Sequence, residues 1–166
     1  MPLIGFFDQK DQKAIDKFIN EIFSEMGWKK DFLYGTEDIA SSFGGEKDAF
    51  FVVKEKDRVV GTLGLKELDE NEGLLKRFYL AEECRGQGVA RDLLKRAIEF
   101  AREKSYQTLV LDTQADNLRA QRFYEKCGFK PFMPKPNKKW PESQHPEIFV
   151  FRKLEIKYFG LSQKSL

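Results

Sequence analysis

Hydrophobic residues near the N-terminus recur at intervals of three and four positions, a pattern that predicts an amphipathic helix. The pattern runs through Ile15, Phe18, Ile19, Ile22, Phe23 and Met26. Asp8 or Asp11 provides a start signal for this helix, and Gly27 provides a stop signal. A more polar second helix is expected at Thr36–Ser42, ending before a pair of glycines.

Three β-rich runs come next, at Ala49–Lys54, Arg58–Glu67 and Gly73–Leu80. The polar connection of residues 55–57 between the first two is short, which predicts a β-hairpin. Residues 69–71 are typical of a turn and separate the second run from the third.

Helical and strand-like patterns alternate in the second half of the chain. We expect a helix at Val89–Lys104 and a strand at Thr108–Leu111, whose unbroken apolar run is typical of a strand buried on both faces. A helix follows at Asn117–Lys126, which Gly128 can end in a left-handed conformation, and a last strand at Ile148–Ile156. Hairpins followed by alternating strands and helices predict a mixed sheet with helices on both faces.

The segment Met133–Pro146 contains four prolines and is expected to be a long surface loop without regular structure. We interpret its basic and aromatic residues as solvated; they are Lys135, Lys138, Lys139 and Trp140. His145 is interpreted as a surface histidine, and Gly160–Leu166 as a frayed tail.

Length and composition favour a single soluble domain covering residues 1–166, with 41% hydrophobic and 34% charged residues. The net charge of +2 is too small to indicate a nucleic-acid partner, and no apolar run is long enough to span a membrane. The N-terminus lacks the basic start of a signal peptide. Cys84 and Cys127 are not in a metal-spaced pair, so we expect no metal, no disulfide framework and a cytoplasmic location.

A glycine-containing stretch, Cys84–Ala90, joins the third β-rich run to the following helix. Gly86 and Gly88 let the backbone turn tightly and approach a ligand, and the N–H groups of a helix N-terminus attract phosphate. The stretch therefore predicts a phosphorylated cofactor, although an ordinary tight turn explains it as well. A dinucleotide fingerprint would need a third glycine in place of Arg91, and a Walker loop would need Gly-Lys-Ser/Thr.

A second motif lies downstream, separated from the first by one predicted helix and one predicted strand. The first motif has Arg85, Gly88 and Ala90 in the pattern Gln/Arg-x-x-Gly-x-Gly/Ala. The second has the pattern Asn-x-x-Ala-x-x-Phe-Tyr-x-x-x-Gly-Phe, matched by Asn117, Ala120, Phe123, Tyr124, Gly128 and Phe129. With both motifs, the chain resembles the GNAT superfamily of acetyl-CoA-dependent N-acetyltransferases. The detailed resemblance covers residues 74–132.

The resemblance implies an α/β (mixed α+β) fold. Its mostly antiparallel sheet has six to seven strands flanked by about four helices, with two parallel strands splayed at the centre. It also implies acetyl-CoA as the acetyl donor, with its diphosphate on backbone N–H groups of the first motif. The residues concerned are Arg85, Gly86, Gln87, Gly88, Val89 and Ala90. The Arg85 side chain would add positive charge, or would simply be solvated.

Further site residues also follow from the resemblance. Backbone groups of Phe78 and Leu80 would pair with the pantetheine arm, as an added strand would. Asn117 would contact the cofactor, cap a helix, or do both. The Phe78 N–H would stabilise the oxyanion, and Tyr124 would protonate the departing thiolate, unless it is only a core aromatic residue.

The catalytic base is where the sequence departs from the family pattern, because Leu74 stands where many members have Glu. Strand alternation places Glu72 on the same face as Phe78 and Leu80, so Glu72 is the nearest candidate carboxylate. An exposed hairpin residue is the other interpretation of Glu72. A chain of water molecules could then take the proton of the amine in place of a carboxylate.

Three functions remain compatible with these residues. The first is transfer of an acetyl group from acetyl-CoA to a primary amine of a small molecule or peptide, by direct attack in a ternary complex. The second is a non-catalytic acyl-CoA-binding or sensing domain, and the third is another nucleotide-binding module. The sequence specifies neither the acceptor nor whether the protein is a monomer or a homodimer. The resemblance implies that Asp8–Phe43 and Met133–Glu147 form the walls of the site that binds the acceptor amine.

Overall fold

A computed structural model describes residues 2–28 and 38–159 of the chain. The chain forms two compact units. The first contains residues 1–66 and 77–100, and the second contains residues 67–76 and 101–166. Part of the expected second helix, from Thr36, and the expected tail Gly160–Leu166 lie outside the described residues. No helix within the described residues is long and apolar enough to cross a membrane.

The first unit contains the predicted hairpin, formed by β2 (Ala49–Glu55) and β3 (Arg58–Glu67), whose strands are antiparallel. A further strand, β1 (Leu3–Phe6), pairs with β2 in the antiparallel sense, from Leu3 opposite Lys54 to Phe6 opposite Phe51. The sequence analysis did not predict β1, because four residues are too few to show a strand period.

Helix α1 (Gln12–Met26) confirms the predicted amphipathic helix and both of its end signals. The Asp8 side chain caps a short 3₁₀ turn at Gln9–Asp11 by accepting a hydrogen bond from the Lys10 N–H. Gly27 then ends α1 in the left-handed conformation, with φ of 69°. A single turn, α2 (Ile39–Ser42), follows within the described residues.

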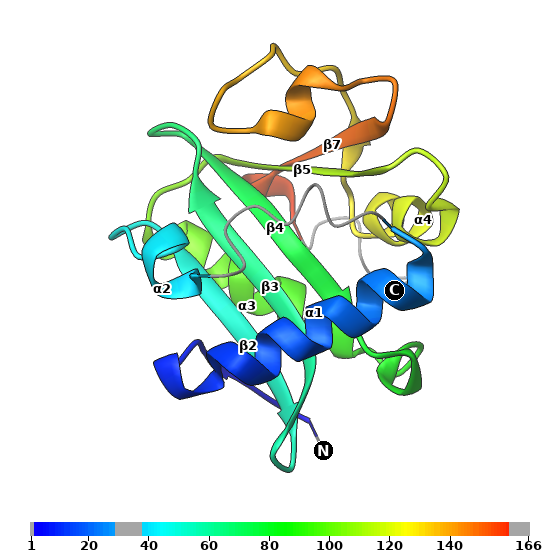
Figure 1. Ribbon diagram of the computed structural model, residues 1–166. Coiled ribbons are helices and arrows are strands. Elements are labelled where there is room, and N and C mark those ends of the chain that lie inside the picture. The colour runs from blue at the N-terminus through cyan, green and yellow to red at the C-terminus, as the bar shows by residue number, and fades with distance from the viewer. Residues whose placement is uncertain (1, 29–37, 160–166) are drawn as a thin grey trace. The chain divides into compact units, whose positions relative to one another are not determined.

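Helices cover both faces of the hairpin: α1 lies in front of β2 and β3 in Figure 1, and α3 (Val89–Glu103) lies behind. Neighbouring phenylalanines of β2 explain this arrangement, because successive strand residues point to opposite faces. The Phe51 ring meets Phe100 of α3 at 6.2 Å between centroids, whereas the Phe50 ring meets Phe43, after α2, at 5.0 Å.

Strand β4 (Glu72–Leu80) has an irregular backbone at Arg77, which adopts a positive φ of 56°. The buried Thr62 hydroxyl of β3 donates a hydrogen bond of 2.7 Å to the Arg77 carbonyl. A left-handed residue cannot continue the pleat of a strand. The alternation expected from Glu72 to Leu80 is therefore interrupted at Arg77, and the shared face of Glu72 and Phe78 stays a prediction.

The second unit is built around β5 (Thr108–Gln114), whose residues Leu109, Val110 and Leu111 are all buried as predicted. Strand β7 (Phe149–Glu155) is antiparallel to β5 along its whole length. On the other edge, the start of β4 runs parallel to β5 for three described pairs, from Glu72–Thr108 to Leu74–Val110.

Helix α4 (Leu118–Lys126) follows β5, with Asn117 as its N-cap and Gly128 beyond its end at φ of 98°. The two-residue strand β6 (Lys130–Pro131), which the sequence analysis missed, pairs with β7. The described strands have the hydrogen-bonded order β1-β2-β3-β4-β5-β7-β6. The predicted mixed and mostly antiparallel sheet, with four helices and one parallel strand pair, is confirmed.

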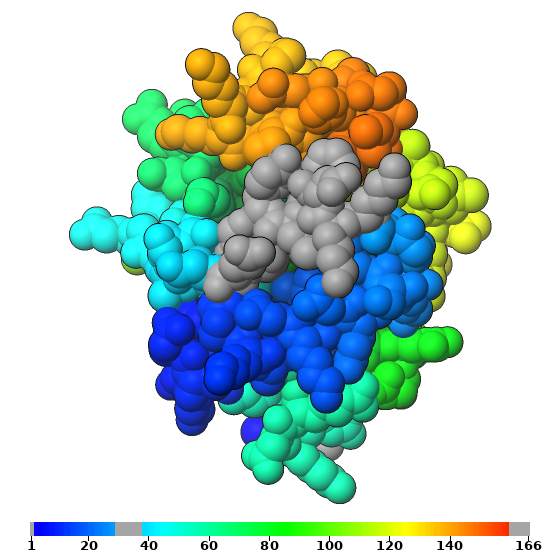
Figure 2. Space-filling view, viewed as in Figure 1, coloured from blue at the N-terminus to red at the C-terminus, as the bar shows by residue number. Residues whose placement is uncertain are grey.

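The segment between β6 and β7 differs from the expected irregular surface loop. It contains a 3₁₀ turn at Pro141–Gln144 and an isolated bridge between Asn137 and Trp140. Residues 133–148, drawn in orange, contribute a continuous piece of the surface in Figure 2. Trp140 of this segment is only 1% exposed, and its indole packs edge-on against Phe151 at 5.4 Å between ring centroids. Its interpretation as part of a solvated cluster was wrong.

Candidate functional site

The bend before α3 has the backbone that the first motif requires. Gly86 and Gly88 both have positive φ, at 76° and 83°, and α3 begins at the next residue, Val89. A Cβ added at either glycine would meet no heavy atom within 4 Å, so open space adjoins the bend. Because the first N–H groups of a helix lack intrahelical partners, this bend is suited to an anion.

Arg85 is more constrained than either sequence interpretation assumed. Its Nε donates to the Leu80 carbonyl at 3.0 Å, and its Nη2 forms an ion pair with Glu25 of α1 at 2.8 Å. The side chain therefore fixes the start of the bend and is not simply solvated. Gln87 is exposed, and its amide donates to the Glu83 carbonyl.

Cys84 lies at the start of the bend but is not an activated thiol. Its side chain is buried, and its sulfur lies 3.8 Å from a carboxylate oxygen of Glu55. Burial first, and then the negative charge of Glu55, raise the pKa of the Cys84 thiol. The structure therefore gives no reason to assign a nucleophilic cysteine.

The proposed acetyl-binding residues Phe78 and Leu80 follow the left-handed Arg77 on β4. Phe78 is half-buried and Leu80 is buried. The Leu80 carbonyl already accepts the Arg85 hydrogen bond, which leaves it less available to a ligand than the sequence suggested. Their role toward a cofactor stays a prediction.

In the second unit, the second motif spans α4, with Asn117 as the N-cap of the helix and Tyr124 within it. Tyr124 is 7% exposed, and its ring makes edge contacts with Phe123 and Phe129, both at 5.6 Å between centroids. The Asn117 side chain accepts a hydrogen bond of 3.2 Å from the Ala120 N–H, which confirms the helix-capping interpretation. Contacts of Tyr124 and Asn117 with a cofactor stay predictions.

Glu72 lies where the β3–β4 turn ends and β4 begins. Its backbone N–H donates to the Asp69 carboxylate at 2.8 Å, and its carbonyl accepts from the Leu68 N–H. Partial burial, followed by the charge of Asp69, raises the pKa of the Glu72 carboxyl above its ordinary value. Leu74 is 1% exposed and belongs to the apolar core.

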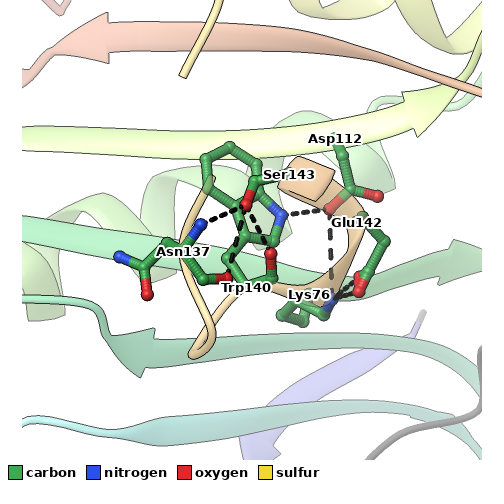
Figure 3. A network of polar contacts seen from close by, with 6 residues as sticks. All are labelled: Lys76, Asp112, Asn137, Trp140, Glu142 and Ser143. Atoms are coloured by element: carbon green, nitrogen blue, oxygen red, sulfur yellow. Dashed lines mark hydrogen bonds and ion pairs between the residues drawn. The ribbon is translucent and has the colours of Figure 1, made fainter. Parts of the chain in front are cut away.

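A polar network that sequence reasoning missed lies at the end of the β4–β5 ladder, within the second unit. Figure 3 shows Lys76 of β4 reaching both Asp112 of β5 and Glu142 of the 3₁₀ turn. The Lys76 Nζ lies 2.6 Å from Glu142 Oε1 and 3.9 Å from Asp112 Oδ2. The Glu142 side chain is 3% exposed, so this is a buried ion pair.

The same network holds the segment before β7. The Trp140 indole N–H donates to Asp112 at 2.7 Å, and the Ser143 hydroxyl donates to the Trp140 carbonyl at 2.6 Å. The Asn137 N–H in turn donates to the Ser143 oxygen (Figure 3). The sequence offered a signal for this network. Lys76 lies inside the predicted strand Gly73–Leu80, Asp112 directly follows the predicted strand Thr108–Leu111, and a charge at a buried strand needs a partner.

Within the described residues, no group of three or more His, Cys, Asp and Glu side chains is arranged to hold a metal ion.

The family model of the GNAT acetyltransferases matches residues 15–129, which is well over half of the chain and includes both motifs. The chain belongs to the GNAT acetyltransferase family. The relatives that the chain matches are named N-acetyltransferases, in agreement with the family model.

Known GNAT proteins share substantial sequence with this chain. Human N-acetyltransferase 8B is 37% identical over 99 residues, covering 56% of this chain and 44% of that protein. N-alpha-acetyltransferase 30 of Schizosaccharomyces pombe is 36% identical over 84 residues, 48% of this chain and 55% of that protein. The matches thus span about half the length of these relatives. An uncharacterized N-acetyltransferase of Escherichia coli, YjgM, is 28% identical over 78% of this chain and 82% of its own length.

Solved GNAT structures share the fold at low sequence identity. A GNAT acetyltransferase from Staphylococcus aureus superposes with a TM-score of 0.81 at 21% identity, covering 94% of this chain and 99% of that one. An aminoglycoside 6'-N-acetyltransferase complexed with coenzyme A gives a TM-score of 0.69 at 12% identity, over 93% and 97% of the two chains.

Replacing Gly88 by alanine is expected to weaken coenzyme A binding about five- to thirtyfold, because a left-handed L-residue costs about 1–2 kcal/mol and the bend would relax away from that shape. Isothermal titration calorimetry with coenzyme A measures the change. Gly5→Ala is the matched control, since Gly5 lies on β1 with open space around it and no positive φ. Equal affinity of both variants would show that the bend does not bind the cofactor.

Proposed function

We propose that this GNAT protein transfers the acetyl group of acetyl-CoA to a primary amine of a small molecule or peptide. The observation that carries the proposal is the left-handed pair Gly86 and Gly88 at the start of α3, inside the region that matches the family. Neither glycine is explained by packing, since an added Cβ at either would meet no heavy atom within 4 Å.

The chain's residues suit the donor molecule. Backbone N–H groups of Gly86–Ala90 would hold its diphosphate at the N-terminus of α3. The bend keeps its shape through Arg85, whose guanidinium joins Leu80 to Glu25. Arg85 therefore contributes mainly by shaping the bend, because Glu25 already neutralises its charge.

The proposed chemistry divides among three residues. Acetyl-CoA supplies an acetyl group as a thioester, whose carbon–sulfur bond breaks as the amine nitrogen forms its bond to the carbonyl carbon. The Phe78 N–H stabilises the negative charge that develops on the carbonyl oxygen. Tyr124 gives its phenol proton to the departing thiolate, and the proton lost by the amine passes to Glu72 or to water. The products are the N-acetyl amine and free coenzyme A.

The acceptor is proposed only as a class. Among the relatives, N-alpha-acetyltransferase 30 is named for acetylation of an α-nitrogen, and zebrafish N-acetylaspartate synthetase is named for an acetylated amino acid. These matches cover 55% and 29% of those proteins, and their names indicate a peptide or a small molecule as the amine.

Thiol release from acetyl-CoA in the presence of polyamines, amino acids, aminoglycosides and peptide N-termini tests the proposal. We expect release that depends on one class of amine. Binding of acetyl-CoA in calorimetry without release for any amine would favour a non-catalytic acyl-CoA sensor. Absence of binding at high micromolar acetyl-CoA would contradict both functions.

Tyr124→Phe is expected to lower turnover about 10²-fold while leaving the affinity for acetyl-CoA nearly unchanged, since only the thiolate loses its proton donor. Steady-state thiol release and calorimetry measure the two quantities. Tyr158→Phe serves as the control because Tyr158 is 56% exposed. The assignment of the acid is wrong if Tyr124→Phe turns over like the control.

The role of Glu72 predicts a particular pH dependence. A base must be ionised, so kcat/KM should fall as the pH drops through the Glu72 pKa, which burial raises above the ordinary value. Glu72→Gln should remove this acidic limb and lower the plateau about 10²-fold. A pH–rate profile from pH 4 to 9 makes the comparison. A water chain carries the proton instead if Glu72→Gln keeps both the limb and the plateau.

A further inference from the structure

The ion-pair network around Lys76 begins where the backbone pairing of β4 and β5 stops. The last described pair joins Leu74 to Val110, and Lys76 and Asp112 each lie two residues further along their strands. Past that pair, an ion pair between the side chains of Lys76 and Asp112 connects the two strands, with 3.9 Å between Nζ and Oδ2. The long lysine side chain thus spans the distance between β4 and β5.

Glu142 binds the Lys76 ammonium as well. Both Glu142 oxygens face the Lys76 ammonium, and the side chains of Lys76 and Glu142 are 12% and 3% exposed. Because the pair is shielded from water, its attraction is stronger than that of a surface ion pair. The ammonium therefore has little freedom to move.

The position of Glu142 does not depend on Lys76, because other contacts hold the segment around Glu142. Trp140 is hydrogen-bonded to Asp112 and packed against Phe151. Ser143 receives a hydrogen bond from the Asn137 N–H and donates one to the Trp140 carbonyl. The carboxylate is thus presented to Lys76 from a rigid frame on β5 and the 3₁₀ turn.

Buried ion pairs are poor devices for stability, since apolar residues of the same volume often stabilise a protein as much or more. What they can provide is a defined position, because the two charges must meet in one geometry. In this network the ion pair positions the β4 backbone at residue 76, immediately before the left-handed Arg77 and two residues before Phe78.

We propose that Lys76 and Glu142 are positioning residues of the acetyl-transfer reaction. Their buried ion pair fixes the β4 backbone at residue 76, and this sets the position of the Phe78 N–H that stabilises the oxyanion. The inference rests on the proposed function, which assigns that role to Phe78. It adds two residues that act through the β4 backbone, since their ion pairs are with each other and, for Lys76, with Asp112.

Glu142→Gln tests the inference, because it removes the charge and keeps the shape. Glu103→Gln is the matched control, being the same substitution at an exposed residue of α3 outside the expected acceptor walls. We expect Glu142→Gln to lower kcat roughly ten- to a hundredfold, since a small misplacement of a catalytic group has that effect. The affinity for coenzyme A in calorimetry should stay within about twofold, because the glycine bend is unchanged. Rates are normalised to the folded fraction from circular dichroism.

An activity-independent measurement accompanies the kinetics. Glu142 is 64 residues from Phe78 in the sequence, so a shift of the Phe78 backbone amide resonance in Glu142→Gln would report the coupling through Lys76. The control Glu103→Gln should leave that resonance in place. An unmoved Phe78 resonance together with a wild-type kcat would overturn the inference.

The double variant Lys76→Met/Glu142→Leu covers the case in which Glu142→Gln does not fold. It replaces the whole pair by apolar groups, so it should fold while kcat remains low. Recovery of kcat to the wild-type value would mean that the pair serves stability alone. If the wild type itself acetylates no amine, the proposed function fails, and the Phe78 resonance alone then decides whether the coupling exists.

Discussion

The hydrogen bond from the buried Thr62 hydroxyl to the Arg77 carbonyl is the interaction on which the proposed site depends. It gives a partner to the carbonyl of a residue whose positive φ interrupts β4. The hydrogen bond therefore restrains the β4 backbone at the residue directly before Phe78, to which the proposed function assigns the oxyanion contact.

Two further restraints act on either side of the interruption. Before it, Lys76 is tied to Asp112 and Glu142 by buried charges. After it, Arg85 joins the Leu80 carbonyl to Glu25 at the start of the glycine bend. The Lys76 pair is shielded from water, whereas Arg85 and Glu25 are partly exposed. Both restraints are charge-assisted and directional, so they define a position more sharply than apolar packing does. The result is a strand whose backbone is fixed at both ends of the proposed acetyl site.

Local signals in the sequence predicted much of this fold. Gly27 and Gly128 ended their helices as expected, and Asn117 capped α4, because these effects depend only on neighbouring residues. The left-handed Arg77 gave no signal, since its carbonyl is held by Thr62 of β3, which lies fifteen residues earlier in the sequence. The Lys76–Glu142 pair joins residues 66 positions apart, and no local pattern reports such a contact. The roles of Tyr124, Phe78 and Glu72 came from the family motif and from strand alternation, and they remain predictions.

Backbone amide shifts during a coenzyme A titration test the central claim most directly, namely that the glycine bend before α3 holds the cofactor diphosphate. The account predicts that the largest shifts occur at the amides of Gly86 to Arg91, because their N–H groups would point at the phosphate oxygens. Saturable binding that leaves these amides unshifted, with the changes concentrated elsewhere in the chain, would contradict it.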